Sequence, residues 1–473
     1  MTLVALTGLS LETTGELRYL GSLPPDLAVD AEGTTLGQGP VLDQRLRIAL
    51  DAKGETWSFG TEWDLFSGQL AGDPWDVPGT VDARHREDLG VLDAGSFVPR
   101  RVAADALLGP VQVQAGLVTS NWGLGMLAND GAHDPTFGRA DFGDRVLRVR
   151  LATRPFDGGA FPLTFAIAGD RVIEDELARF DDAQVAWQGV AAAIYAPESG
   201  NRLGAYGVYR DQTEADVVRF TRVGLVDLYG ELVLPLGTAK LRAGAEAAGV
   251  KGTTSRVSNY GAPEGLDVLS AGATGFVGVA TEADRWGAKV RGGWASGDAN
   301  PDDGVSNDFT FDRDYDAGML LFDEQGGAVE AGTHALLTDL EHTGRAPDGV
   351  EALVTEGSFR RATFVQPVLD ASPLPWLGVR VGVFAAWSTA PIAQPYYTFR
   401  NGGVATNHLD APTDGNALGT ELDWAVRLGG VEVGPERARV RPELLVQGAH
   451  AWASPAMGGE ALTMLTATAR ARW

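Results

Sequence analysis

Cysteine is absent from the 473-residue chain. Its absence fits an oxidising compartment outside the cytoplasm, where a stray thiol is a liability. The sequence also has no run of about 18 apolar residues, which excludes a membrane-spanning helix. Residues 1–9 are too short and lack the basic region of a cleavable signal peptide, so we interpret the chain as a mature form with an added initiator Met.

Two further absences narrow the choice of fold. No fixed short repeat is visible, which disfavours a β-solenoid. No linker or low-complexity break divides the chain into units of about 100 residues, as a series of β-sandwich domains would require. The formal net charge of -25 argues against nucleic acid as a partner.

What the sequence does contain is an alternation of apolar and polar residues in segment after segment. In the last one, residues 461–473, Leu465 and Trp473 fall on one face and Arg470 on the other. Successive side chains of a strand point to opposite sides, so this segment is predicted to be a strand with one apolar and one polar face. The same pattern is already present at residues 11–20.

The connections between these segments are alternately short and long, as they are between strands that run up and down. We count about eighteen strands, with sixteen as the alternative if the weak segments at 98–106 or 203–210 are misread. In hydrocarbon a sheet pairs all its backbone groups only by closing on itself. The predicted fold is all-β, a single transmembrane antiparallel β-barrel with short periplasmic turns and long extracellular loops.

The predicted organisation has one short segment and one domain. Residues 1–10 form a short periplasmic N-terminal segment, and residues 11–473 form the barrel. Long outer loops are expected near residues 68–95, 119–143, 298–355 and 390–417. An even strand number places both termini on the periplasmic side. At this width side chains alone cannot fill the lumen, so we expect the protein's own loops to narrow it.

Aromatic residues gather at predicted strand ends, where the two interfaces between membrane and water would lie. Trp57, Tyr195, Trp286, Trp376 and Trp473 fall at predicted periplasmic ends, and Tyr19, Trp187, Phe220, Trp294, Trp387 and Trp452 fall near predicted outer ends. We expect a bacterial outer-membrane location, with the lipid bilayer and lipopolysaccharide as partners. A final aromatic residue is typical of such barrels, so we expect the barrel-assembly machinery to recognise Trp473.

Arginines recur on the polar faces that would line the lumen. The predicted pore-lining and solute-binding residues are Arg18, Arg45, Arg47, Arg148, Arg150, Arg380, Arg427, Arg437, Arg439, Arg441, Arg470 and Arg472. An arginine ladder would attract anionic solutes, because the planar guanidinium stays charged and binds carboxylates. Acids such as Glu16 and Glu443 lie on the same faces, and they leave open a simpler interpretation in which the charges pair and solvate a polar wall.

The long segment at 297–357 combines an apolar stretch with many acids. Met319, Leu320, Leu321 and Phe322 are predicted to form a constriction loop that folds inward or packs under the rim, with a buried anchor as the alternative. The spacing of Asp298, Asn300 and Asp302 resembles the start of a calcium loop, but the glycine is displaced and Phe309 stands where an EF-hand has Glu. These three residues are candidate Ca²⁺ ligands, and no other cofactor is expected.

Enzymatic chemistry has little support. The local acid–histidine pairs are His133 with Asp134, and His85 near Asp82 and Asp88. No convergent set of nucleophile, base and orienting group emerges from them. We therefore expect no catalytic residues.

Several stretches resemble the porin-like superfamily that includes alginate-export channels and related uncharacterised outer-membrane families. They are residues 122–129 (WGLGMLAN), 295–303 (ASGDANPDD), 311–323 (FDRDYDAGMLLFD) and 418–423 (LGTELD). The architectural resemblance covers the whole chain, whereas these motifs cover only a small part of it. The resemblance implies a channel for small or polymeric polar solutes, and no stretch matches an alginate-binding site.

The sequence thus predicts an outer-membrane channel for passive diffusion of small polar, mainly anionic solutes. Three alternatives stay open: an exporter of an anionic polysaccharide, a surface adhesin or structural barrel with a blocked lumen, and an outer-membrane hydrolase. An exporter would need an unobstructed lumen, whereas a porin would be narrowed by its loops.

Overall fold

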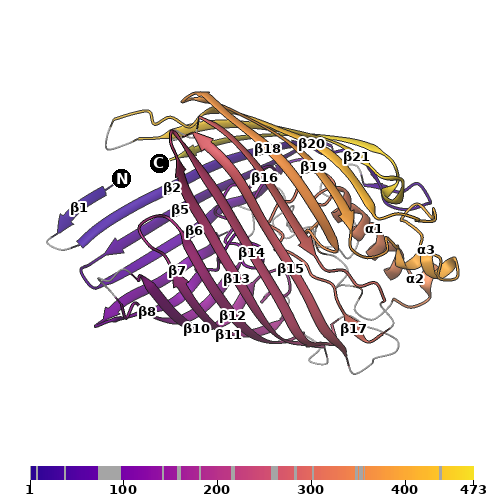
Figure 1. The fold of residues 1–473 in the computed structure, drawn as a ribbon, viewed down its shortest axis with the longest axis horizontal. Coiled ribbons are helices and arrows are strands. Elements are labelled where there is room, and N and C mark those ends of the chain that lie inside the picture. Colours follow the sequence, from indigo (N-terminus) through magenta and orange to yellow (C-terminus); the bar gives the residue numbers. More distant parts are fainter. Residues whose placement is uncertain are drawn as a thin grey trace.

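The computed structural model describes residues 2–473 except 7–8, 37–38, 73–96, 141–142, 157–160, 181–182, 215–218, 257–264, 282–284, 301–302, 347–349, 351–354, 356 and 436–438. Within these residues, twenty strands form one sheet and two more form a separate hairpin. Eighteen of the twenty close into an antiparallel barrel (Figure 1). The predicted fold class is confirmed, and the alternative of sixteen strands is excluded.

The barrel strands follow one another around the wall in chain order. They are β2 (Leu9–Leu23), β5 (Val41–Lys53), β6 (Trp57–Ala71), β7 (Phe97–Leu108), β8 (Val111–Thr119), β9 (Arg145–Thr153), β10 (Leu163–Glu174), β11 (Val185–Tyr195), β12 (Arg202–Thr213), β13 (Phe220–Leu236), β14 (Ala239–Thr254), β15 (Leu266–Thr281), β16 (Trp286–Ala295), β18 (Ala362–Leu374), β19 (Leu377–Ser388), β20 (Ala417–Gly429), β21 (Arg441–Ala453) and β22 (Ala461–Arg472). Both of the segments with weak alternation in the sequence, β7 and β12, are strands of the barrel.

The barrel closes where β22 pairs with β2, from Glu16 opposite Arg472 to Leu23 opposite Leu465. Gly15 and Trp473 complete the seam with two backbone hydrogen bonds of 3.0 Å. A Cβ atom at Gly15 would lie 2.2 Å from the indole of Trp473. A glycine is therefore needed at this position to make room for the terminal aromatic ring.

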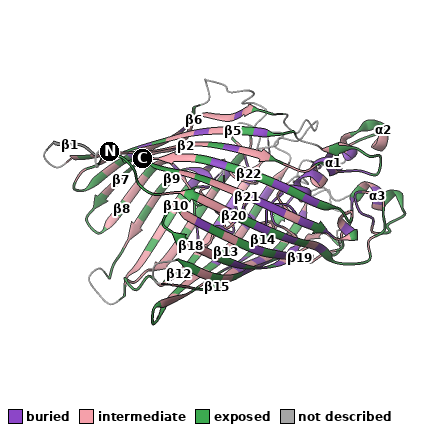
Figure 2. Cartoon of the chain, turned by 90° about the horizontal axis from the view of Figure 1, so that it is seen from above, coloured by how far each residue is buried: buried purple, intermediate pink, exposed green. Residues whose placement is uncertain are grey.

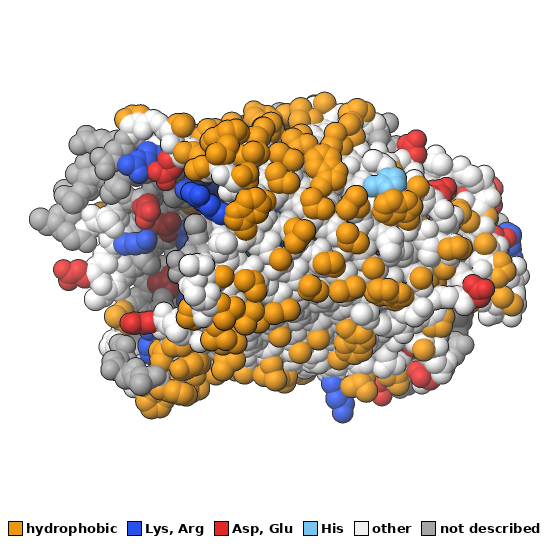
Figure 3. Space-filling model, turned by 45° about the horizontal axis from the view of Figure 1, so that its top comes forward, with side chains coloured by type: hydrophobic (Ala, Val, Ile, Leu, Met, Phe, Trp, Pro, Cys, Tyr) orange, Lys and Arg blue, Asp and Glu red, His pale blue; other side chains and the backbone are white. Residues whose placement is uncertain are grey.

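The outer surface is apolar because every second strand residue faces outward. In β9, Leu147, Val149 and Leu151 are 52%, 58% and 42% exposed, whereas Arg148 and Arg150 between them point into the barrel. Figure 2 shows this alternation along the strands, and Figure 3 shows the resulting apolar surface with charged side chains toward its two ends. So large an exposed apolar surface matches the lipid-facing wall of a membrane barrel.

Exposed aromatic residues mark both borders of this surface. Trp286 begins β16 and Trp294 lies near its end, and both are largely exposed. The eight-residue separation corresponds to about 26 Å along the strand, which at a tilt of about 35–45° spans roughly 20 Å, most of an apolar band about 25 Å tall. Trp57 and Trp473 extend the first border, and Trp452 extends the second.

We call the barrel end with the short connections and both termini the turn end, and the opposite end the loop end. At the turn end β1 (Thr2–Leu6) pairs with β2, so the predicted N-terminal segment carries a strand. The loop end holds the hairpin of β3 (Leu27–Ala28) and β4 (Thr35–Leu36), β17 (Val305–Ser306), and the helices α1 (Gln325–Thr338), α2 (Leu340–Thr343) and α3 (Pro395–Arg400). None of the helices in the described part of the chain has the length and hydropathy to cross a membrane.

Two long connections between strands enter the barrel. We name the described residues of 120–144 lumen loop 1 and the described residues of 307–361 lumen loop 2, of which α1 and α2 remain at the loop end. Their apolar side chains, among them Met126, Phe137 and Phe311, pack on small or aromatic inward residues of β18–β22 such as Phe384 and Ala449. One side of the lumen is thus occupied by a hydrophobic core.

Candidate functional site in the barrel lumen

Lumen loop 1 crosses the lumen from wall to wall. At one side the indole N–H of Trp122 donates a 3.0 Å hydrogen bond to Asp227 on β13. At the other, the Arg18 guanidinium on β2 donates to the Ala140 carbonyl at 3.4 Å. In the strand order, β13 and β2 stand on opposite sides of the eighteen-strand barrel. The loop therefore divides the lumen into a turn-end side and a loop-end side.

Polar contacts fix this loop to further strands between those two points. The Thr136 carbonyl accepts from Arg380 on β19 at 2.5 Å, and the Gly138 carbonyl accepts from Gln447 on β21 at 2.8 Å. Arg139 forms an ion pair of 3.1 Å with Asp43 on β5. At Gly382 on β19 a Cβ atom would lie 2.7 Å from the Phe137 ring, so this glycine makes room for the loop.

Residues 319–321 of lumen loop 2 are bound by one carboxylate, that of Glu421 on β20. Its oxygens accept the backbone N–H groups of Met319 at 2.6 Å, Leu320 at 3.0 and 3.1 Å, and Leu321 at 3.0 Å. Met319, Leu320 and Leu321 are buried, and Phe322 packs against Phe384. The stretch predicted as a constriction lies inside the barrel, but its side chains fill the core and anchor the loop.

The two lumen loops also bind each other. The backbone N–H groups of Arg139 and Gly143 donate to the carboxylates of Asp316 and Asp314 at 2.7 and 2.6 Å. Burial raises the pKa of the Asp316 carboxyl well above its usual range, and the neighbouring Asp323 raises it further. The two loops form one joint structure within the lumen.

Several predicted arginines share one wall, as barrel closure implies. In the sheet register Arg18 stands opposite both Arg45 and Arg470, and Glu16 stands opposite both Arg47 and Arg472. These strands, β22, β2 and β5, are consecutive around the barrel. The structure therefore brings together the arginines of the first and last strands.

Most of these arginines are paired with acids. Ion pairs join Arg45 to Glu16 (2.8 Å), Arg47 to Asp64 (2.7 Å), Arg148 to Asp170 (2.7 Å), Arg150 to Asp105 (3.8 Å), Arg380 to Asp370 (2.5 Å), Arg470 to Asp134 (2.7 Å) and Arg472 to Glu16 (2.7 Å). Burial alone would raise the pKa of the Asp134 carboxyl, but its pairing with Arg470 and Arg472 lowers that pKa below the usual range. Arginine and acid thus alternate on the wall.

The other predicted arginines lie near the turn end. Arg427 donates to the Gly429 carbonyl at 3.0 Å. Arg439 precedes β21 instead of lying on a strand face, and both it and Arg441 are exposed and pair with Glu432 at 2.9 and 3.6 Å. Arg437 lies outside the described residues.

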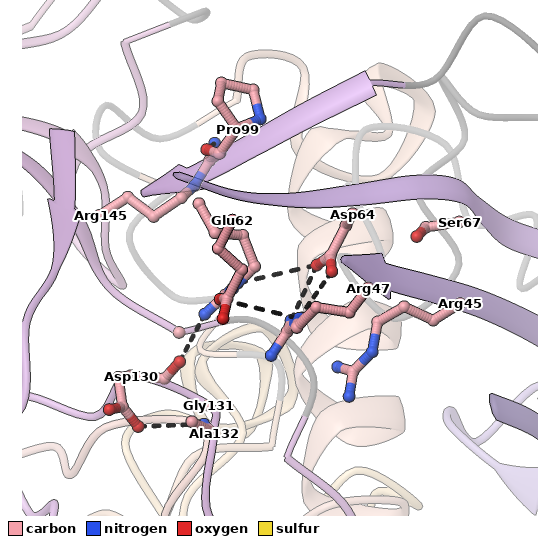
Figure 4. A network of polar contacts seen from close by, with 12 residues as sticks. Arg45, Arg47, Glu62, Asp64, Ser67, Pro99, Asp130, Gly131, Ala132 and Arg145 are labelled. Carbon is pink, nitrogen blue, oxygen red and sulfur yellow. Dashed lines mark hydrogen bonds and ion pairs between the residues drawn. The ribbon is translucent and has the colours of Figure 1, made fainter. Parts of the chain in front are cut away.

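Arg100, which the alternation pattern missed, is the most buried arginine of this wall. A register shift between Glu62 and Trp63, where β6 pairs with β7, inserts an extra residue in β7, and such a bulge turns a side chain to the other face. Arg100 lies 3.5 Å from Glu62 and donates to the Asp130 carbonyl of lumen loop 1 at 2.5 Å. Figure 4 shows Glu62 and Asp130 of this network, with Arg47 and Asp64 beside them. In the sequence, the two adjacent arginines at 100–101 are the feature from which a second inward arginine could be predicted.

A cavity of about 620 Å³ borders lumen loop 1 on the side of β13–β19. Its lining includes residues near the turn end of these strands, such as Glu231 and Ser372. Four cations line it, Arg242, Lys289, Arg291 and Arg380, together with the acids Asp134, Glu231, Asp314, Asp316 and Asp370. Its volume is that of a pocket for a small organic molecule, and its lining offers both signs of charge.

The candidate calcium residues form turn contacts. The Asp298 carboxylate accepts the Asn300 N–H at 3.0 Å, as in an ordinary Asx turn, and Asp302 lies outside the described residues. His133 lies 3.3 Å from Asp130, while Asp134 is bound to Arg470. His85 falls outside the described part of the chain.

Comparison with known proteins gives a structural match only. No family model and no curated protein sequence matches the chain. Among solved structures, OccK8 (OprE) of Pseudomonas aeruginosa matches at a TM-score of 0.52 with 9% identity, over 98% of each chain. A BenF-like porin from Pseudomonas fluorescens Pf-5 matches at 0.52 with 12% identity, over 97% of each chain. Pseudomonas aeruginosa OpdK, solved with vanillate, matches at 0.50 with 12% identity, over 98% of this chain and 99% of that one.

Such low identities show the fold alone, which is that of outer-membrane porins and Occ-type channels. The porin-like part of the resemblance is confirmed at the level of fold. Its alginate-export part has no specific support.

Proposed function

We propose that the protein is an outer-membrane channel through which small polar, mainly anionic solutes diffuse passively. The observation that carries this proposal is lumen loop 1, which crosses the barrel between an arginine-rich wall and a cavity of about 620 Å³. A channel needs a narrow section with polar groups that replace the solute's hydration. The loop together with the wall supplies both.

The inward loops favour small solutes over polymers. Lumen loop 2, including residues 319–322, fills part of the lumen and packs in the same hydrophobic core as lumen loop 1. A polysaccharide exporter would require these loops to leave, which means breaking the Glu421 contacts and the ion pairs of lumen loop 1. The contacts between loops and wall therefore weigh against that alternative.

The preference for anions rests on the arginines that stay accessible. The side chains of Arg472, Arg150 and Arg380 are 40%, 32% and 35% exposed despite their acidic partners. A carboxylate solute can compete for such a guanidinium with two parallel hydrogen bonds. The match to OpdK, which was solved with vanillate, agrees with this solute class.

The membrane placement follows from the surface. The apolar band between the aromatic borders would face lipid, the turn end the periplasm, and the loop end the lipopolysaccharide leaflet. Trp473, exposed at the turn end, is in the position at which the barrel-assembly machinery would meet it.

Liposome swelling tests the solute class. We expect vesicles that contain the protein to admit a small carboxylate faster than an amine of equal size, and to exclude a polysaccharide. Equal rates for anion and cation would contradict the arginine assignment, and entry of the polymer would favour an exporter.

A further inference from the structure

Three acidic side chains from three different loops meet near the loop end. Asp144 ends lumen loop 1, Glu176 lies in the connection from β10 to β11, and Asp312 belongs to lumen loop 2. Each contributes a carboxylate oxygen, and these oxygens all lie within 4.8 Å of one another. Asp144 and Asp312 are buried and Glu176 is half-buried. Three carboxylates this close repel one another, and either a proton or a cation among them relieves the repulsion.

One of the three carboxylates has an unused oxygen in the protein interior. Asp312 is 2% exposed, and its Oδ1 accepts the N–H of Asp314 at 2.8 Å. Its Oδ2 is buried and has no hydrogen-bond partner in the described part of the chain. An unpaired carboxylate oxygen is costly to bury, so such an atom takes up a proton or a ligand.

The nearby arginines form ion pairs with acids adjacent to the cluster. Arg210 binds Asp175 through two nitrogens at 2.6 and 3.1 Å. Arg145 donates to Glu174 at 3.0 Å, and Arg313 lies 3.6 Å from the same carboxylate. Charge compensation around Glu174 and Asp175 is therefore dense, and the charge of Arg313 also attracts the three carboxylates of the cluster.

We propose that Asp144, Glu176 and Asp312 bind one divalent cation that prefers oxygen ligands, with Ca²⁺ the best fit. In irregular loops Ca²⁺ is bound by carboxylates through one or two oxygens each, and water molecules complete its coordination. The cation would tie the two lumen loops to the connection that follows β10. It would act as a clip on the structure that narrows the lumen.

This site is separate from the predicted calcium loop at Asp298 and does not depend on the transport proposal. Ca²⁺ binding and its effect on stability can be measured without any solute. Protein that is purified unfolded and then refolded in detergent carries no lipopolysaccharide, which would itself bind divalent cations.

The test is Ca²⁺ titration calorimetry on the full chain, refolded in neutral detergent and stripped with EDTA. We expect saturable binding of one Ca²⁺ per chain with a Kd at or below about 1 mM, the weak end of protein calcium sites. The double variant Asp144→Asn with Glu176→Gln should bind at least tenfold more weakly. The matched control Asp414→Asn with Glu460→Gln, which also removes two acids but at exposed loop-end positions, should bind like the wild type. Absence of saturable binding by the wild type, or loss of binding in the control alone, would overturn the site.

A stability measurement covers the case in which the double variant folds poorly. Ca²⁺ should raise the thermal midpoint of the wild type relative to EDTA and leave that of the double variant unchanged. In EDTA the double variant should be at least as stable as the wild type, because it has lost like-charge repulsion. A wild-type midpoint that is the same in Ca²⁺ and in EDTA refutes the clip, whatever the variant does.

Discussion

Replacing Glu421 by Gln should loosen lumen loop 2 without disturbing the barrel wall. The carboxylate is fully buried and accepts three backbone N–H groups, those of Met319, Leu320 and Leu321. The amide keeps one acceptor oxygen but presents an NH₂ group to the remaining donors. We therefore expect one or two of the three hydrogen bonds to be lost.

The magnitude follows from the kind of bond. A hydrogen bond to a charged group contributes about 1.5–3 kcal/mol net, so losing one or two costs roughly 2–5 kcal/mol of loop docking. Part of this is offset, because Asp423, also buried and two residues away on the same inward face, loses a negative neighbour. We expect the lower half of the range, which still changes the docked-to-undocked ratio by about thirtyfold or more at 1.4 kcal/mol per factor of ten.

Single-channel recording in planar bilayers measures this change directly. Glu421→Gln should show open-channel flicker and a higher mean conductance than the wild type. Glu12→Gln on β2, where the glutamate pairs only with exposed Lys53 in the described residues, is the matched control and should record like the wild type. Identical conductance and noise in Glu421→Gln and the wild type would refute the anchoring function of Glu421.

Three further predictions concern the wall and the loop end. Leu444→Arg should cost about 2–4 kcal/mol of stability in a lipid bilayer, because Leu444 is exposed and pairs with Ala469, four residues from the border at Trp473. Leu374→Arg, beside Trp376 at that border, should cost at most about 1 kcal/mol. Urea titration of both variants in a lipid bilayer measures the two losses of stability, and equal losses would mean that the membrane borders are misplaced. Arg150→Glu with Arg472→Glu should lower the anion preference more than Arg439→Glu with Arg441→Glu does. The reversal potential in a salt gradient measures this preference, and the reverse order would contradict the assignment of anion preference to the wall arginines. Burial lowers the pKa of His408 to about 4, so folding stability is full above pH 6.5 and falls by up to about 3 kcal/mol as the pH drops toward 4. Hydrogen exchange of the 401–417 loop should show that loss in the wild type and less of it in His408→Gln; an equal loss in both would contradict the assignment to His408.

The wall of the barrel could be predicted because its rules are local. In β22 the apolar and polar residues alternate from Leu465 to Arg472, and burial alternates from Ala461 to Ala469 in the structure. A side-chain period of two, repeated between turn residues, is enough to identify each strand. Strand count, closure through Trp473 and the aromatic borders all follow from that pattern.

The lumen could not be predicted in the same way, because its contacts join residues far apart in the chain. Glu421 is 100 residues from Leu321, and the composition of neither segment predicts the contact between them. A polar loop has the same composition whether it extends into water outside the barrel or folds into a polar lumen. The sequence therefore predicts residues 119–143 only as an outer loop. The space that Gly382 leaves for the Phe137 ring is visible only in the structure.

The bulge at Arg100 shows a second limit. A strict alternation puts Arg100 and Arg101 on opposite faces, yet Arg100 reaches Asp130 and Arg101 reaches Asp51, both inside the barrel. One extra residue changes the face of a side chain, and sequence period alone does not reveal where it is inserted.

We propose that the lumen is a water-filled path controlled by its arginine wall and inward loops. Single-channel current across a planar bilayer, with a salt gradient to give the reversal potential, tests it most directly. We predict a steady conductance with anion preference. Protein shown to be inserted that passes no current, or a channel that prefers cations, would contradict it.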